Sequence, residues 1–106
     1  MANEPEWLTE SDQDYATRVA RREGRISSVA QDGGGIRKQL DVIGPIQSHI
    51  ERAARSVMKL NAKNVAQVIP GVIDDLKAAA AVAAEHEKIL YLANEHGWAF
   101  INQYEK

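Results

Sequence analysis

Two long stretches of the sequence place apolar residues every seven positions, and this spacing restricts the fold more than any other feature. The first stretch contains two such repeats, Ile36, Ile43, Ile50 and Val57, and Ile46, Ala53 and Leu60. The apolar stripe of the second stretch consists of Val72, Leu76, Ala79, Ala83, His86, Leu90 and Ala93. Steps of three and four residues follow one side of an α-helix, and no alternating strand pattern persists over five residues. The sequence therefore predicts an all-α fold.

The helical segments predict a single domain built as an up-down bundle of three main helices. We expect these helices over residues 12–30, 36–60 and 72–96, with short extra helical turns. Ser11 is suited to cap the start of the first helix, because its side chain can accept a bond from an unpaired backbone N–H group. Gly97 is suited to end the last helix.

Two proline-glycine pairs interrupt this pattern. Gly44-Pro45 lies inside the second predicted helix, where proline removes a backbone donor and clashes with the preceding turn. The chain there either kinks or breaks, and in the second case Pro45 starts a new helix. The apolar stripe stays in phase across Pro45, which favours the kink. Pro70-Gly71 is the clearest boundary in the chain, and we expect residues 63–69 to form a separate short turn before it.

The two ends of the chain differ from the helical segments. Residues 1–10 predict a flexible N-terminus, and residues 98–106 predict a docked aromatic tail. The tail contains Trp98, Phe100 and Tyr104. These side chains either close the bundle or form a contact for a partner, because Trp and Tyr dominate the energetics of many binding sites.

The third predicted helix has more apolar surface than one stripe needs. Alanines make up much of its stripe, and each alanine buries little apolar area, so we expect a monomer of marginal stability. A second apolar row, formed by Val82, Ile89 and Leu92, broadens the surface. We therefore expect a homo-oligomer whose interface contains Val82, His86 and Ile89 together with the aromatic side chains of the tail.

Composition excludes several classes of protein. The chain has 106 residues and no cysteine, which excludes a disulfide scaffold, thiol catalysis and cysteine metal sites. No apolar run approaches the roughly 18 residues that a membrane span needs, so we expect no membrane partner. The N-terminal residues are acidic and polar, unlike a secretory signal, and this predicts a cytoplasmic protein.

No arrangement of residues predicts a catalytic group, a metal or a cofactor. His49 adjoins Ser48, but neighbouring helix residues point about 100° apart and do not form a dyad. His86 is expected as a hydrogen-bonded core or interface residue, and a pH-sensitive contact is the alternative. The Glu-x-x-His pairs of metal-binding bundles are absent. The glycines before Ile36 predict a flexible loop, with a weak anion contact as the alternative, because the phosphate-loop motifs are absent.

Basic residues are concentrated in the middle of the chain. Residues 15–63 contain ten bases and four acids, whereas the 14 residues before them contain five acids and no base. Helical spacing groups the bases on faces of the first two helices, namely Arg18, Arg21, Arg22, Arg25, Arg52, Arg55 and Lys59. Arginine pairs bidentately with carboxylates and phosphates. These faces are either solvated and neutralised by Glu23, Glu51 and the acidic termini, or they bind an acidic protein surface, nucleic acid or a nucleotide.

These observations predict a small non-enzymatic helical protein that binds other proteins as an adaptor, an inhibitor or an assembly component. We expect it to cover an acidic surface of its partner with the basic faces and to form a homo-oligomer. Small cysteine-free helical chains of this kind are common among the regulators of phages and mobile elements. The alternative hypothesis is a phosphate-recognising protein that binds nucleic acid or a small nucleotide through the same arginines.

Overall fold

A computed structural model describes residues 4–30, 35–97, 99 and 101, and these form an all-α structure. A short 3-10 helix, η1 (Glu6–Leu8), precedes three α-helices, α1 (Asp12–Ser27), α2 (Ile36–Met58) and α3 (Val65–His96). The described residues contain no strand. The predicted fold class is therefore confirmed, although the first two helices end slightly earlier than predicted.

The expected boundary at Pro70-Gly71 is wrong, because α3 begins at Val65 and continues through the proline. Pro70 lies in the second turn and is exposed, so its missing donor removes one backbone bond near the start of a long helix. Val68 is half-buried and Val72 is buried, so the buried side of α3 continues across this position. Packing of that side compensates for the local cost of the proline.

The Gly44-Pro45 pair also lies inside a continuous helix, which excludes a break in α2, the less favoured of the two expected alternatives. Gly44 is buried where α1 and α2 approach each other closely. A β-carbon at Gly44 would lie 2.8 Å from Cδ1 of Ile26, which is closer than real β-carbons come to other atoms. The glycine therefore allows the side chain of Ile26 to reach the backbone of α2.

Side chains and glycine define the ends of the helices as the sequence predicts. The Oγ atom of Ser11 accepts a hydrogen bond of 3.1 Å from the backbone N–H of Asp14. Gly97 ends α3 with a φ of 82°, a value that favours glycine, and its N–H donates to the carbonyl of Ala93. Between α2 and α3, the side chains of Asn61 and Asn64 accept bonds from the backbone of the turn.

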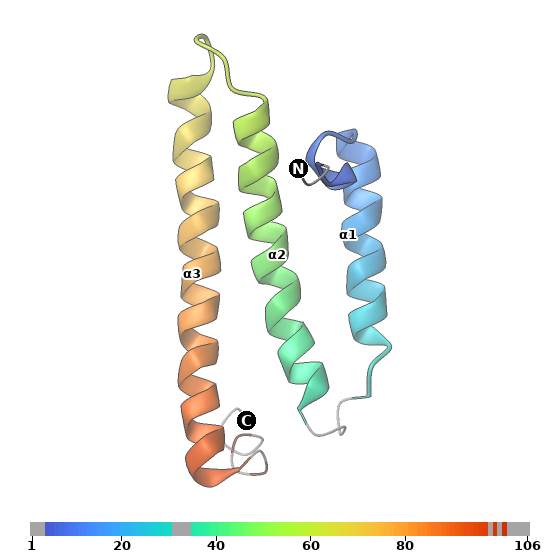
Figure 1. The fold of residues 1–106 in the computed structure, drawn as a ribbon, viewed down its shortest axis with the longest axis vertical. Coiled ribbons are helices and arrows are strands. Elements are labelled where there is room, and N and C mark those ends of the chain that lie inside the picture. Colours follow the sequence, from blue (N-terminus) through green and yellow to red (C-terminus); the bar gives the residue numbers. More distant parts are fainter. Residues whose placement is uncertain (1–3, 31–34, 98, 100, 102–106) are drawn as a thin grey trace.

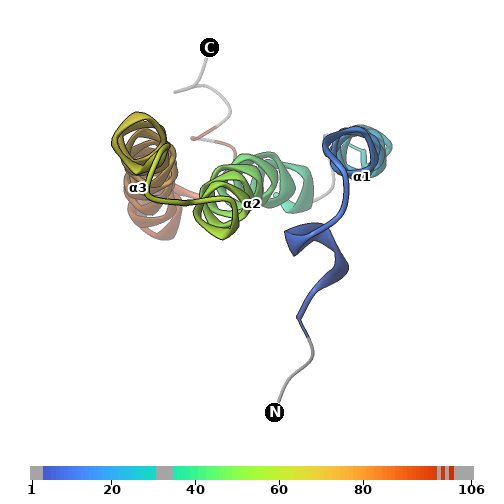
Figure 2. The same ribbon diagram turned by 90° about the horizontal axis from the view of Figure 1, so that it is seen from above.

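The three helices lie side by side in a row, with α2 in the middle (Figure 1). The view from above shows α1 and α3 on opposite sides of α2, so the helices do not close a triangular bundle (Figure 2). The radius of gyration is 16.9 Å, whereas a compact chain of 106 residues has about 13 Å. The row leaves both flat sides of the α2–α3 pair uncovered by α1.

Polar contacts establish how α2 and α3 align. Gln39 contacts His86 through an Oε1–Nε2 distance of 2.6 Å, and His49 contacts Asp75 at 3.1 Å. Ala53 lies on the same side of α2 as these residues and is almost completely buried. We call this contact between α2 and α3 the seam. Its buried apolar side chains are Ala53 on α2 and Val72, Ala79 and Ile89 on α3, and polar pairs occur at two levels.

Candidate functional site

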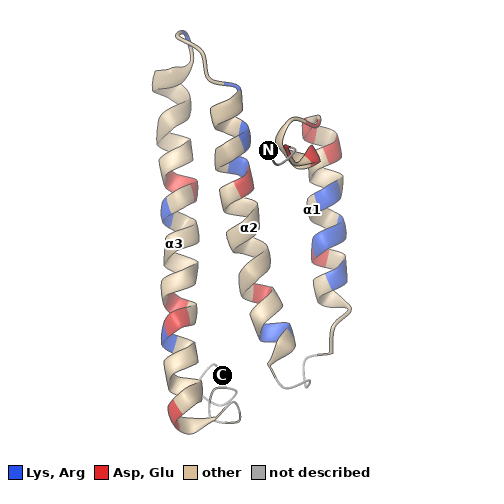
Figure 3. Cartoon of the chain, viewed as in Figure 1, with Lys and Arg blue, Asp and Glu red and all other residues tan. Residues whose placement is uncertain are grey.

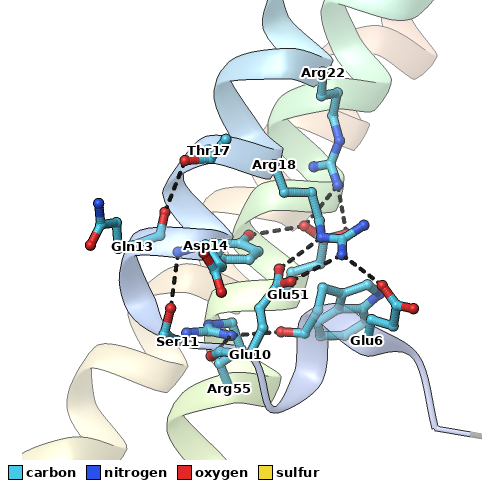
Figure 4. A network of polar contacts seen from close by, with 12 residues as sticks. Glu6, Glu10, Ser11, Gln13, Asp14, Thr17, Arg18, Arg22, Glu51 and Arg55 are labelled. Atoms are coloured by element: carbon cyan, nitrogen blue, oxygen red, sulfur yellow. Dashed lines mark hydrogen bonds and ion pairs between the residues drawn. The ribbon is translucent and has the colours of Figure 1, made fainter.

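A cluster of charged residues joins α1 to α2, and its centre is the buried carboxylate of Glu51. The Tyr15 hydroxyl donates to Glu51 Oε1 at 2.9 Å, and Arg22 Nη2 donates to both carboxylate oxygens at 2.9 and 2.7 Å. Arg22 also donates to the Ser48 hydroxyl. Burial and the hydrogen bond to Glu51 raise the pKa of Tyr15 to about 12. The close view in Figure 4 shows Arg22 of α1 and Glu51 of α2 pointing toward each other between the two helices.

Arg55 lies one turn after Glu51 and is 5% exposed, which is rare for an arginine. Its Nη1 atom donates to the backbone carbonyls of Trp7 and Glu10, at 2.6 and 2.9 Å, and its Nη2 atom donates to Asp12 at 2.8 Å. The guanidinium carbon also lies 4.5 Å from the centre of the Tyr15 ring, within the range of a cation–π interaction. Arg55 therefore attaches η1 and the start of α1 to α2. We call Tyr15, Arg22, Glu51 and Arg55 the polar cluster.

Further ion pairs surround the polar cluster. Arg18 Nε donates to Glu10 at 2.7 Å, and this bond lowers the pKa of Glu10 and raises that of Arg18 (Figure 4). Lys59 donates to Asp12 at 2.9 Å. The bond from Lys59, followed by that from Arg55, lowers the pKa of Asp12. Residues 4–10, expected to be flexible, thus contain groups that pair with α1 and α2.

The structure therefore places most of the predicted basic residues in contacts within the chain. Arg18, Arg22, Arg55 and Lys59 pair with acids on η1, α1 or α2, and Arg52 pairs with Asp75 on α3. Arg21 and Arg25 are exposed, and neither side chain forms an ion pair with the residues that the structure describes. The groove beside them is lined by carboxylates as well, from Glu6, Glu10 and Asp14. The sequence offered neutralisation by Glu51 and the acidic N-terminus as an alternative to a binding surface, and the structure pairs bases with these acids.

His49 belongs to a second polar group, at the seam. Its Nδ1 atom lies 3.1 Å from Asp75 Oδ1 and 2.8 Å from Arg52 Nη2, and Arg52 also donates to Asp75 at 3.0 Å. One nitrogen holds one proton at most, so Nδ1 either donates to Asp75 or accepts from Arg52. Burial raises the pKa of Asp75, but the bonds from His49 and Arg52 outweigh it and leave this pKa below its usual value.

Every buried side-chain nitrogen and oxygen of the described residues has a hydrogen-bond partner. Within the same residues, no three His, Asp or Glu side chains converge as a metal site. None of the helices in the described part of the chain has both the length and the apolar character to cross a bilayer. A groove of about 750 Å³ between α2 and α3 is lined by groups of both charges, including Lys38, Asp41 and Glu85.

The side of the α2–α3 pair opposite this groove exposes large apolar side chains. Lys38 and Asp41 line the groove just described, and helical periodicity places the seven-residue repeat of α2 on the opposite side of that helix. The repeat is exposed, with 61% for Ile36, 46% for Ile43, 48% for Ile50 and 47% for Val57. Exposed residues of α3 face the same side, among them Leu76 at 48% and Leu90 at 42%. Large apolar side chains exposed together indicate a contact surface.

The alignment of the seam shows how these side chains pair across the surface. Because α2 and α3 are antiparallel, the contacts of Gln39 with His86 and of His49 with Asp75 place each apolar residue of α2 beside one of α3. The resulting pairs are Ile36 with Leu90, Ile43 with Ala83, Ile50 with Leu76, and Val57 with Ile69. We call these eight residues the apolar face. Ile69 is half-buried and the other seven are exposed.

Charged residues are almost absent from the apolar face. Long uncharged stretches run along α2 and α3, whereas α1 is rich in both charges (Figure 3). Helical periodicity places some further residues of α2 and α3 on the same side as the apolar face. Among these, the single ionisable residue is Glu87, near one end of the face. The face is therefore an uncharged apolar surface, in contrast to the strongly charged helix α1.

The predicted interface residues of α3 lie outside the apolar face. Ile89 is buried, and Val82 and His86 are half-buried, and all three line the groove between α2 and α3. Trp98, Phe100 and Tyr104 lie outside the described residues. The sequence already contains the apolar repeat of the apolar face, Ile36, Ile43, Ile50 and Val57, but it does not show that this side of α2 is exposed.

Comparisons with protein-family models, with curated proteins and with solved structures find no significant match to this chain. Its function is therefore inferred from its own residues and geometry.

Proposed function

We propose that the chain is a non-enzymatic protein-interaction module whose contact surface is the apolar face of α2 and α3. The single observation that supports this proposal is the exposure of Ile36, Ile43, Ile50 and Val57 in one uncharged stripe. Monomeric proteins rarely leave such a contiguous apolar surface in water, because its burial is favourable by about 25 cal/mol per Å². The module would act as an adaptor, an inhibitor or an assembly component by covering a matching surface.

The alternative, recognition of phosphate by the arginines, receives less support. A phosphate-binding groove needs several cations whose charges are available to a ligand. Arg22 and Arg55 are largely buried and already pair with Glu51 and Asp12. Arg21 and Arg25 are exposed, but they border carboxylates that would repel a phosphate. We therefore keep phosphate binding as an outcome that an experiment can reveal, and place the main function on the apolar face.

Photo-cross-linking in the native cells tests this proposal. A benzophenone amino acid replaces Ile50 on the apolar face, and the control replaces Ala84, which is exposed on the outer side of α3. We expect one discrete cross-linked protein from position 50 and none from position 84. The adduct should disappear when Ala83→Glu is added, because a carboxylate then lies in the face. Equal labelling from both positions, or no adduct from position 50, would contradict the proposal.

A further inference from the structure

We infer that the apolar face binds a second copy of this chain, so that two α2–α3 pairs close a four-helix bundle. In this arrangement α2 of each copy lies against α3 of the other, and the twofold axis runs parallel to the helices. The inference rests on the proposed function, because it names the occupant of the same surface. Three features of the structure favour a second copy over another occupant.

The first feature is the surface area that the single chain leaves exposed. The chain exposes 7583 Å², whereas a compact monomer of 11.7 kDa exposes about 5,900 Å². The apolar face is about 35 Å long, from the 23 residues of α2, and about 20 Å wide across two helices. Its footprint of about 700 Å² is close to the roughly 800 Å² that each partner buries in a standard stable interface.

The second feature is the repeat length. Helices of a multi-helix bundle use two adjoining apolar stripes, because each helix contacts more than one neighbour. On α2 the seam occupies one stripe and the apolar face a second, and α3 has the same division. A partner must match the seven-residue spacing of both exposed stripes at once. A second copy does so necessarily, since its face has the same spacing.

The third feature is the match of side-chain sizes under this symmetry. The apolar face pairs the large Ile43 with the small Ala83, so it has a ridge on α2 and a hollow on α3 at this level. A twofold axis parallel to the helices places Ile43 of each copy over Ala83 of the other. Large-on-small packing of this kind fills space without overlap.

The charges around the face argue against a lipid surface as the occupant. Helices that lie on membranes have Lys and Arg beside their apolar side, where they meet anionic headgroups. The only ionisable residue in the helical sector of the apolar face is the acidic Glu87. A second copy tolerates this residue, because it lies near the end of the face, where it can reach solvent.

Sedimentation equilibrium of the purified full chain tests this inference. At about 100 µM, we expect a mass twice 11.7 kDa. Two adjacent exposed alanines provide a matched pair of variants, because Ala83 lies on the apolar face and Ala84 is turned about 100° away from it. Ala83→Glu should raise the dissociation constant of the dimer at least about 100-fold, since it places an unpaired charge in the interface. Ala84→Glu should leave this constant unchanged, and both variants should keep the wild-type helical circular dichroism.

Disulfide formation tests the arrangement, because the chain has no native cysteine. A mixture of the single variants Ile43→Cys and Ala83→Cys should give a mixed disulfide, and Ile43→Cys with Ala84→Cys should not. A wild-type chain that remains monomeric, or equal dimerisation of both glutamate variants, would overturn the inference. If the purified chain is monomeric while position 50 still cross-links a different protein in cells, the second copy is excluded and the proposed function stands. If neither association is found, both fail.

Discussion

The two helix contacts of this molecule are built from different chemistry. Between α1 and α2, a buried carboxylate and a buried guanidinium, Glu51 and Arg55, make most of the specific contacts. Between α2 and α3, small apolar residues such as Ala53 and Ala79 pack closely, and polar pairs occur at two levels. Breaking a buried ion pair is costly, but forming one adds little net stability. The α2–α3 pair therefore depends on apolar burial, and α1 depends on directional bonds.

The two contacts differ in whether their side chains find all their partners within the chain. The polar cluster has its partners within the chain, so α1 covers one edge of α2 and needs no further contact. The α2–α3 pair buries one apolar stripe of each helix and leaves another exposed. An interaction surface is expected where large apolar side chains remain exposed, and in this chain that is the apolar face.

Removal of the Glu51 carboxylate should have the largest effect. Glu51→Ala leaves Arg22 without its ion pair and the Tyr15 hydroxyl without its acceptor, and we expect a loss of about 3 to 5 kcal/mol in the free energy of unfolding. Urea unfolding measures the loss, and hydrogen exchange should show α1 opening before α3. Asp74→Ala, which removes an exposed acid of α3 outside the apolar face, is the control and should change stability by less than about 0.5 kcal/mol. Similar losses in both variants would show that the polar cluster does not hold α1.

Truncation in the seam should have the next largest effect. Ile89→Ala removes a buried side chain that is 8% exposed, and we expect a loss of about 2 to 3 kcal/mol in the free energy of unfolding. Because Ile89 lies between α2 and α3, hydrogen exchange should accelerate in these helices rather than selectively in α1. Selective opening of α1 in this variant would contradict the division into two kinds of contact.

Acid should weaken the contacts of α1 and one level of the seam. Ion pairs lower the pKa of Glu10 below its ordinary 4.5 and the pKa values of Asp12 and Asp75 below 3.8. When folding lowers the pKa of a carboxyl group, its ion pair stabilises the folded chain at pH values above the ordinary pKa. This stabilisation is lost as the pH falls through the lowered pKa. Stability should therefore stay constant from pH 7 to about 5 and fall below about pH 4.5. Urea midpoints that do not change between pH 7 and pH 3 would show that these pairs add nothing.

Two glycine substitutions should have the smallest effects and should differ from each other. Gly71→Ala adds a methyl group that meets no atom within 4 Å, and the helix propensity of alanine should stabilise the protein by about 1 kcal/mol. Gly44→Ala gains the same propensity, but its methyl group meets Ile26 Cδ1 at 2.8 Å, so the gain should be smaller or reversed. Thermal unfolding of both variants measures the difference. Equal gains would mean that α1 does not approach α2 closely at Gly44.

The sequence predicted the helical class and the caps at Ser11 and Gly97, because local spacing and cap chemistry determine them. It did not predict that α3 passes through Pro70, because packing of Val68 and Val72 against α2 outweighs a local preference. Periodicity identifies which sides of a helix are apolar, but not which neighbour each side meets. It therefore left open that the helices form a row.

The basic residues show the same limit for the candidate site. Arg55 and Lys59 follow one helix face and resemble a binding surface in the sequence, yet their acid, Asp12, lies far away along the chain. Only the fold brings the acidic N-terminal segment against α2. The repeat that contains Ile43 and Ile50 is visible in the sequence, but spacing alone does not tell whether this side of the helix is buried or exposed.

One measurement compares the apolar face directly with the exposed arginines. The benzophenone probe at position 50 is placed in two backgrounds, Ala83→Glu and the double variant Arg21→Glu with Arg25→Glu, and the yield of the cross-linked adduct is measured in cells. We predict that Ala83→Glu abolishes the adduct and that the double arginine variant leaves it unchanged. Loss of the adduct in the double arginine variant, with full yield in Ala83→Glu, would place the contact surface on α1 and contradict the account.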